Sequence, residues 1–171
     1  MFRIIGAVII VACTAAFGFS GVTRLRVRVK NLQNLITALE IMKSEICERL
    51  TPMTEILTAL SQETQAPVSG IFKECCNQMS QLGSRSFYFI WKSAVEGACD
   101  LELTEHEKKI LTDMGHVLGR YDIQEQKSAI TYAIRRLETC LQNAEEEKRS
   151  QSKVHAALGV SAGLFIVIIL I

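Results

Sequence analysis

Two uncharged apolar runs, one near each end of the chain, limit what it can fold into. Residues 4–22 hold nineteen residues without a charged side chain, and residues 156–171 hold sixteen more. At 1.5 Å per helical residue these runs reach about 28 Å and about 24 Å, close to the roughly 30 Å hydrocarbon core of a bilayer. We therefore expect an N-terminal transmembrane helix over residues 1–23 and a shorter C-terminal one over residues 154–171.

The section between the two runs is acidic. Residues 31–150 contain all eighteen acidic residues of the chain and thirteen of its nineteen basic ones, a net charge of −5. Proteins that bind the phosphate backbone of nucleic acids need a basic surface. We therefore expect no nucleic-acid partner.

Basic residues gather on the inner flank of each apolar run. Short flanks rich in Lys and Arg stay on the cytoplasmic side of a membrane. The pattern predicts that residues 24–153 form a cytosolic domain and that both termini lie outside the cytoplasm. The predicted juxtamembrane basic anchor consists of Arg24, Arg26, Arg28, Lys30, Lys148, Arg149 and Lys153.

A cleaved leader is the alternative for the first run. Arg3, the apolar stretch and the small residues Ala15 and Ala16 fit a secretory signal peptide. The sequence "IVAC", which ends at Cys13, also resembles a lipoprotein cleavage box. The run continues nine residues past Cys13 and ends in a basic cluster, which favours a retained membrane helix.

The six cysteines bear on the compartment of the section between the runs. They show no C-x-x-C spacing that would indicate a zinc site or a redox motif. We expect them to be reduced and buried as small apolar residues, as in a cytoplasmic domain.

Apolar residues at spacings of three and four predict helices throughout this section. The first helix is expected to run from the membrane to about Arg49, and the last from Asp122 back to the membrane. The predicted apolar face of the first holds Leu32, Leu35, Ile36, Leu39, Met42, Ile46 and Leu50, and that of the last holds Ile123, Ile130, Ile134, Leu137, Leu141 and Ala144.

Start and stop residues divide the remainder into shorter helices. A second helix is expected at Pro52 with Thr51 as its N-cap, and a third between Pro67 and Gly83. A fourth, opened by Ser84 or Ser86, holds "FYFIW" at residues 87–91, because no second strand is available to pair with these aromatic residues.

Two capping boxes mark the last two helix starts. Thr104 with Glu107, and Asp122 with Glu125, each place a cap acceptor three residues before a Glu that can bind the N–H of the cap. Gly119 is expected to end the intervening helix as a left-handed C-cap. The chain is therefore predicted to be an all-α, six-helix bundle whose first and last helices continue as the transmembrane helices.

Enzyme signatures do not assemble. "HEKKI", which begins at His106, has Ile110 where a zinc-protease motif needs its second His. His106, Asp113 and His116 are better explained as residues of a solvated helical face than as metal ligands. We expect no catalytic residues, no metal, no cofactor and no small-molecule substrate.

Small residues in the terminal runs are typical of membrane helices that pack closely. Gly159 and Gly163 stand four residues apart, and Ala12 and Ala16 form a weaker pair in the first run. We predict a helix-packing role for these four residues, with incidental glycine and alanine content as the alternative.

The chain resembles the stage III sporulation protein AB family of endospore-forming bacteria. The most specific part is the turn "LGRYDIQEQ", with Leu118, Gly119, Asp122 and Gln126 as its characteristic residues. The other similar stretches are "IIGAVIIVA", "LQNLITALEIMKSEI" followed by "TPMTEIL", "LTEHEKKIL" and the apolar ending.

This resemblance implies a fold similar to the platform domain of type II secretion systems. It also implies a place in the channel complex between mother cell and forespore, in the mother-cell membrane that becomes the outer forespore membrane. The implied partners are the membrane itself, the other membrane proteins of that sporulation channel, and a hexameric secretion-type ATPase in the mother-cell cytosol.

Two functions from different classes follow. The first is an assembly scaffold that couples the cytosolic ATPase to the membrane channel, with the acidic face of the bundle as the docking surface. The alternative is a membrane-anchored helical regulator or sensor, for which the sequence offers no ligand-pocket residues.

Overall fold

The structure is a computed structural model of the chain, and it describes the backbone of residues 2–120 and 122–170 and the side chains of residues 23–120 and 122–151. Within these residues it is all-α, with six α-helices and no strand. The α-helices are α1 (Phe2–Ser44), α2 (Met53–Glu63), α3 (Ser69–Gln78), α4 (Phe87–Gly97), α5 (Glu105–Gly115) and α6 (Ile123–Leu170). Three short helical turns, Glu45–Arg49, Met79–Gln81 and Cys99–Leu101, complete the described secondary structure.

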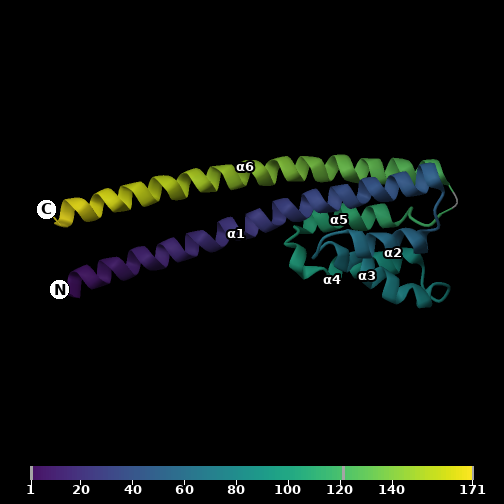
Figure 1. Cartoon of the computed structure of the whole chain (residues 1–171), viewed down its shortest axis with the longest axis horizontal. Coiled ribbons are helices and arrows are strands. Elements are labelled where there is room, and N and C mark those ends of the chain that lie inside the picture. Colours follow the sequence, from purple (N-terminus) through teal and green to yellow (C-terminus); the bar gives the residue numbers. More distant parts are fainter. Residues whose placement is uncertain (1, 121, 171) are drawn as a thin grey trace.

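The two long helices form the spine of the molecule. Figure 1 shows α1 and α6 running antiparallel, side by side, with α2, α3, α4 and α5 gathered beneath one end of the pair. The other end of the pair extends beyond the short helices, so that α1 begins and α6 ends on the same side of the bundle. The predicted all-α architecture with six helices is therefore confirmed.

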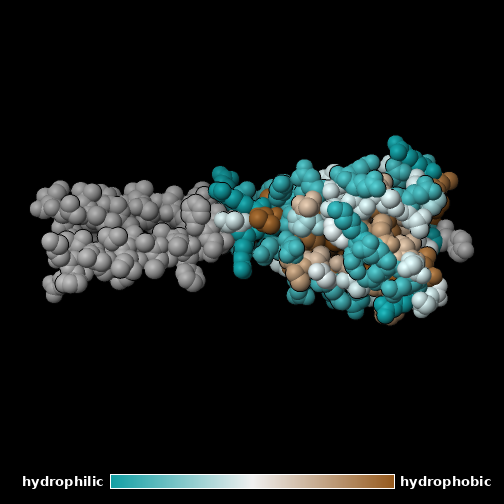
Figure 2. Space-filling view, turned by 60° about the horizontal axis from the view of Figure 1, so that its bottom comes forward, coloured by the Kyte–Doolittle hydropathy of each residue, from teal (hydrophilic) through white to brown (hydrophobic). Residues whose placement is uncertain are grey.

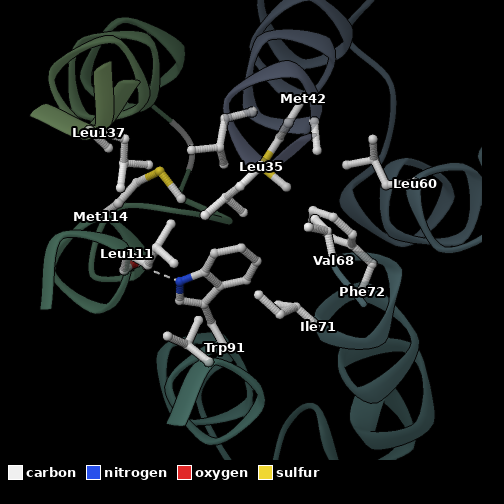
Figure 3. Close-up of a cluster of buried hydrophobic side chains, with 14 of the residues drawn as sticks. Leu35, Met42, Leu60, Val68, Ile71, Phe72, Trp91, Leu111, Met114 and Leu137 are labelled. Carbon is white, nitrogen blue, oxygen red and sulfur yellow. Dashed lines mark hydrogen bonds between the residues drawn. The ribbon is translucent and has the colours of Figure 1, made fainter. Parts of the chain in front are cut away.

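The core lies between the long pair and the four short helices. Figure 3 shows Trp91 of α4 at its centre, with Phe72 of α3 on one side and Leu111 of α5 on the other. The indole N–H of Trp91 donates to the backbone oxygen of Leu111 at 2.7 Å, which satisfies the one polar atom of this buried ring. The predicted aromatic helix "FYFIW" is thus a helix that contributes Ile90 and Trp91 to the core.

The predicted apolar faces match the observed core closely. Leu32, Leu35, Leu39 and Met42 of α1 are fully buried. Leu50 is the exception, because it adopts a left-handed conformation (φ 56°) at the end of the Glu45–Arg49 turn and stays 65% exposed.

The predicted N-cap at Thr51 is wrong. Pro52 occupies the N-cap position of α2, and the Thr51 hydroxyl donates instead to Glu45 Oε2 at 2.7 Å. The backbone N–H of Thr51 donates to the backbone oxygen of Glu45 at 3.0 Å. Thr51 therefore ends the Glu45–Arg49 turn and does not begin α2.

Helix boundaries elsewhere agree in part with the prediction. The Thr104–Glu107 capping box is formed as expected. Asp122 caps α6 as predicted, because its Oδ1 atom accepts from the backbone N–H groups of Gln124 and Glu125 at 2.9 and 3.0 Å. The carboxylate of Glu125, which was expected to bind the N–H of Asp122, lies 3.8 Å from the guanidinium of Arg120.

Two predicted boundaries move inward. Gly119 has a positive φ of 77°, as a left-handed glycine should, but α5 already ends at Gly115. The third helix begins at Ser69 rather than at Pro67, with Val68 in the N-cap position.

No helix in the part of the chain with described side chains has an apolar stretch long enough to cross a bilayer. The expected transmembrane helices at residues 1–23 and 154–171 fall almost wholly on residues 1–22 and 152–171, which lie outside that part.

The cysteines depart from expectation at one position. The five described cysteines are free thiols, of which Cys75 is buried and Cys47, Cys76 and Cys140 are half-buried. Cys99 is exposed, which contradicts its predicted burial, because it lies in the short turn between α4 and α5. Cys13 lies outside the residues with described side chains.

Candidate functional site

A buried ion pair joins α1 to α5 near the point where the long helices leave the bundle. The Arg28 Nη2 atom donates to Glu107 Oε1 at 2.6 Å, and its Nε atom donates to the same oxygen at 3.2 Å. Glu107 Oε2 accepts from the backbone N–H of Thr104 at 2.7 Å, and the Thr104 hydroxyl accepts from the backbone N–H of Glu107 at 3.3 Å. One carboxylate therefore both caps α5 and neutralises a cation of α1.

Neighbouring polar contacts extend this junction to α6 and to the Cys99–Leu101 turn. Arg28 Nη1 lies 3.6 Å from the carboxylate of Glu147 on α6. One turn further along α1, the buried Asn31 donates its amide N–H to the backbone oxygen of Leu101 at 3.1 Å. We call Arg28, Asn31, Thr104, Glu107 and Glu147 the polar junction.

Arg28 keeps its positive charge at neutral pH. The hydrogen bond from Arg28 to Glu107 raises the pKa of the guanidinium, against an opposing effect of burial. Burial raises the pKa of the nearby Cys140 thiol, and the charge of Glu107 adds to this increase. Arg28 therefore provides a permanent positive charge for the Glu107 carboxylate, which suits holding α1 against α5.

The residues of the predicted basic anchor differ in side-chain exposure. Arg24, Arg26 and Lys30 of α1 and Arg149 of α6 are exposed, and Lys148 is half-buried. Figure 2 shows hydrophilic side chains projecting where the described side chains begin. Lys153 lies outside the residues with described side chains.

Arg28 differs from the rest of the predicted anchor, because its side chain is directed into the junction and is only 17% exposed. Two signals in the sequence were available to place it there. Arg28 lies four residues before Leu32, in phase with the buried face of α1. Glu107 is the third residue of a capped helix whose apolar face faces the core, a position that needs a charge partner when it is buried.

The turn that resembles the sporulation family is built by the side chain of Gln126. Its amide N–H donates to the backbone oxygen of Arg120 at 2.6 Å, and its Oε1 atom accepts from the backbone N–H of Gly119 at 3.2 Å. Gln126 and Leu118 are buried, and Asp122 caps α6. These four residues therefore meet in one element, and their visible role is to hold the connection from α5 to α6.

The possible metal ligands are not brought together. The His106 ring lies 3.1 Å from the guanidinium of Arg136, whereas the His116 ring stacks on Tyr88 with a centroid distance of 3.8 Å. No group of three or more His, Cys, Asp or Glu side chains that could hold a metal occurs in the described part of the chain. The predicted helix-packing residues Gly159, Gly163, Ala12 and Ala16 lie outside the residues with described side chains.

The fold and the polar junction together define the class of protein. It is a helical bundle in which four short helices pack against two long antiparallel helices, and a buried ion pair joins α5 to α1. The family model described as "Stage III sporulation protein AB (spore_III_AB)" matches residues 3–171. The chain therefore belongs to the stage III sporulation protein AB family of sporulation proteins, which confirms the resemblance noted in its sequence.

Two relatives agree with this assignment. The stage III sporulation protein AB of Bacillus subtilis (strain 168) is 29% identical over 171 residues, which cover 99% of each chain. A solved structure of a stage III sporulation protein AB superposes with a TM-score of 0.66 at 26% identity, covering 72% of this chain and 98% of that one. The bundle fold is thus shared with a family member of known structure.

Proposed function

We propose that this sporulation protein is a membrane-anchored scaffold of the channel complex between mother cell and forespore. In this proposal residues 24–153 form a domain in the mother-cell cytosol. Both termini lie on the opposite, non-cytosolic side of the mother-cell membrane, which becomes the outer forespore membrane. The bundle docks a hexameric secretion-type ATPase there and contacts the other membrane proteins of the channel.

The observation that carries the proposal is the common direction of the two long helices. α1 begins and α6 ends on the same side of the bundle (Figure 1), so both apolar runs of the sequence are directed toward one surface. Exposed Arg24, Arg26 and Arg149 lie near the point where the long helices leave the bundle, where lipid phosphates would attract them. The polar junction supports a scaffold further, since it fixes the long helices to the short ones near this exit.

Charge supports the docking of a cytosolic partner. The section of residues 31–150 has a net charge of −5, and a basic surface on the ATPase would be drawn to it. Such steering weakens with salt, because exposed charges more than about 8 Å apart are screened at physiological ionic strength.

Membrane topology is tested with reporters on the full chain. Alkaline phosphatase, which is active only outside the cytoplasm, is fused after Ile171 and should give a signal. The same enzyme inserted at the exposed Gly83 should stay silent. A silent fusion at Ile171 or an active insertion at Gly83 would contradict the proposed orientation.

Docking is tested with the full chain in detergent micelles or nanodiscs and the purified hexameric ATPase. Capture at low salt that declines as salt rises supports the scaffold. Absence of capture at low salt contradicts ATPase docking and favours a membrane-anchored regulator.

A further inference from the structure

A groove with acidic walls lies between the start of α3 and the end of α4. It has a volume of about 440 Å³, and the Cys99–Leu101 turn forms part of its lining. Glu74 and Asp100 are the charged residues among those described that line it. Most of the other lining residues are small, and a Cβ added at Gly70 or Gly97 would meet nothing within 4 Å. The groove therefore has room for a side chain from outside, and its two carboxylates would attract a positively charged one.

One face of α1 carries partly exposed apolar side chains. Val27 and Ile41 are 39% and 38% exposed, and Asn34 stands midway between them. Residues seven apart share a helix face, with a drift of about 20° per heptad. We call Val27, Asn34 and Ile41 the open face of α1.

An unsatisfied donor lies in this open face. The Asn34 Nδ2 atom is buried and has no hydrogen-bond partner among the described residues. Such a group costs free energy until an acceptor reaches it. Lys30, one turn from Val27 and Asn34, is exposed and gives this part of the face its positive charge.

The groove and the open face lie at the same level along the long helices. The hydrogen bond from Asn31 to the backbone oxygen of Leu101, a residue of the groove lining, is 3.1 Å long and places this part of the groove at the level of the turns of α1 that hold Val27 and Asn34. Arg24 Nε, two turns before Asn31, lies 3.9 Å from Glu102 at the same turn. Two copies standing parallel would therefore present the groove of one and the open face of the other at equal height.

We propose that the open face of α1 in one copy docks in the acidic groove of a second copy of this chain. Lys30 faces Glu74 and Asp100 of the neighbour, and Val27 covers the small residues of its wall. The contact is heterologous, so repetition around an axis along the long helices builds a ring. The inference rests on the proposed membrane anchoring, because a shared membrane is what holds the copies parallel.

A second copy fits this groove better than an unrelated basic protein for two reasons. Lys30 of the open face has the opposite charge to the two carboxylates of the groove. It also lies at the same level along the long helices as they do. The apolar Val27 beside Lys30 also matches a wall in which small residues accompany the acids. An unrelated protein need not carry a positive charge at this level or an apolar side chain beside it.

Native Cys99 lines the groove and provides a direct test. In membranes that hold the otherwise unchanged full chain, the introduced thiol of Lys30→Cys should form a disulfide with Cys99 of a second copy on mild copper–phenanthroline oxidation. The product runs at twice the mass of the 19.1 kDa chain and disappears in Lys30→Cys/Cys99→Ser. Asn143→Cys, on the exposed side of α6, serves as the matched control and should not form it.

Charge reversal supplies the second test. Lys30→Glu or Asp100→Lys should lower the yield of cross-linking between Val27→Cys and Cys99 at least fivefold, and the combined reversal should restore it. Equal cross-linking of the Lys30→Cys and Asn143→Cys chains, or indifference to charge reversal, would overturn the inference. The reporter fusions described above are read separately, so a chain that is correctly anchored but fails to cross-link refutes the docking of copies alone.

Discussion

Arg28 and Glu107 are separated by 79 positions in the chain, yet their side chains meet at 2.6 Å in the interior of the bundle. The side chain of Glu107 is 0% exposed and that of Arg28 is 17% exposed. A buried charge is tolerated when it is paired and hydrogen-bonded, and both oxygens of Glu107 accept hydrogen bonds here. The pair therefore links α1 directly to α5.

Removal of one partner of this pair should destabilise the chain more than neutralisation of both. We expect Arg28→Met to lower the free energy of unfolding by about 3 kcal/mol, because it leaves the Glu107 carboxylate buried and unpaired. The double variant Arg28→Met/Glu107→Gln should recover most of this loss, since a glutamine oxygen can still accept from Thr104. Urea titration of the full chain in micelles measures both values, and equal stability of the single and double variants would refute the argument.

Gly115 lies against the indole of Trp91, and a Cβ added there would fall 2.3 Å from Trp91 Cδ1. Gly115→Ala should therefore displace the ring, weaken its hydrogen bond to Leu111 and lower the free energy of unfolding by about 1–3 kcal/mol. Trp91 is the single tryptophan of the chain, so its emission reports the displacement directly.

The matched control for this change is Gly70→Ala in α3, where an added Cβ meets nothing within 4 Å. It should leave the tryptophan emission unchanged, and the stability should stay the same or rise by about 0.5–1 kcal/mol, because alanine restricts the unfolded chain. Similar losses in both variants would show that the contact with Trp91 is not the cause.

Gln126 is expected to be required for the connection between α5 and α6. Gln126→Leu leaves the N–H of Gly119 and the oxygen of Arg120 without this partner, at a cost of about 1–3 kcal/mol. Gln126→Glu keeps an acceptor for Gly119 but cannot donate to Arg120, so it should also destabilise. The exposed Gln124 of the same helix is the control, and Gln124→Ala should change stability by less than about 0.5 kcal/mol in the same urea titration.

Repeating patterns explain why so much of the fold was predictable. The spacing of Leu32, Leu35 and Leu39 places them on one face of a helix whatever they pack against, and all three are fully buried. The capping box of Thr104 and Glu107 is equally local, since both hydrogen bonds join residues three apart. Such features need no knowledge of the tertiary structure.

The contacts that the sequence did not reveal involve partners that are distant in sequence or local bonds that compete with one another. Arg28 resembles its exposed basic neighbours until Glu107, 79 positions away, provides a buried acceptor for it. Thr51 has the composition of an N-cap, but Glu45 offers its hydroxyl a carboxylate at 2.7 Å and the cap bond is not made. Sequence patterns record the residue type, whereas the choice between competing partners is made by the packed structure.

Cys75 and Cys99 should differ strongly in reactivity, because the thiolate is the nucleophile. Burial raises the pKa of Cys75 from 9.0 to about 12, with a contribution from the neighbouring Cys76, whereas Cys99 is exposed. At pH 8.5 we expect iodoacetamide to modify Cys99 at least about tenfold faster than Cys75. Mass spectrometry of the digested chain measures both rates, and comparable labelling in the folded protein would contradict the burial of Cys75.

The same raised pKa makes stability depend on pH in a defined interval. Between pH 9 and about 12 the Cys75 thiol stays protonated in the folded chain, while in the unfolded chain it ionises near its ordinary pKa of 9.0. The unfolded state then binds fewer protons, so the stabilising contribution of Cys75 is complete below pH 9 and is lost as pH rises, by up to about 1.4 kcal/mol per pH unit. Cys75→Ala removes this group, and its stability should therefore fall less steeply from pH 9 to pH 10.5 than that of the unchanged chain. Parallel profiles would show that Cys75 ionises as readily in the folded chain as in the unfolded one.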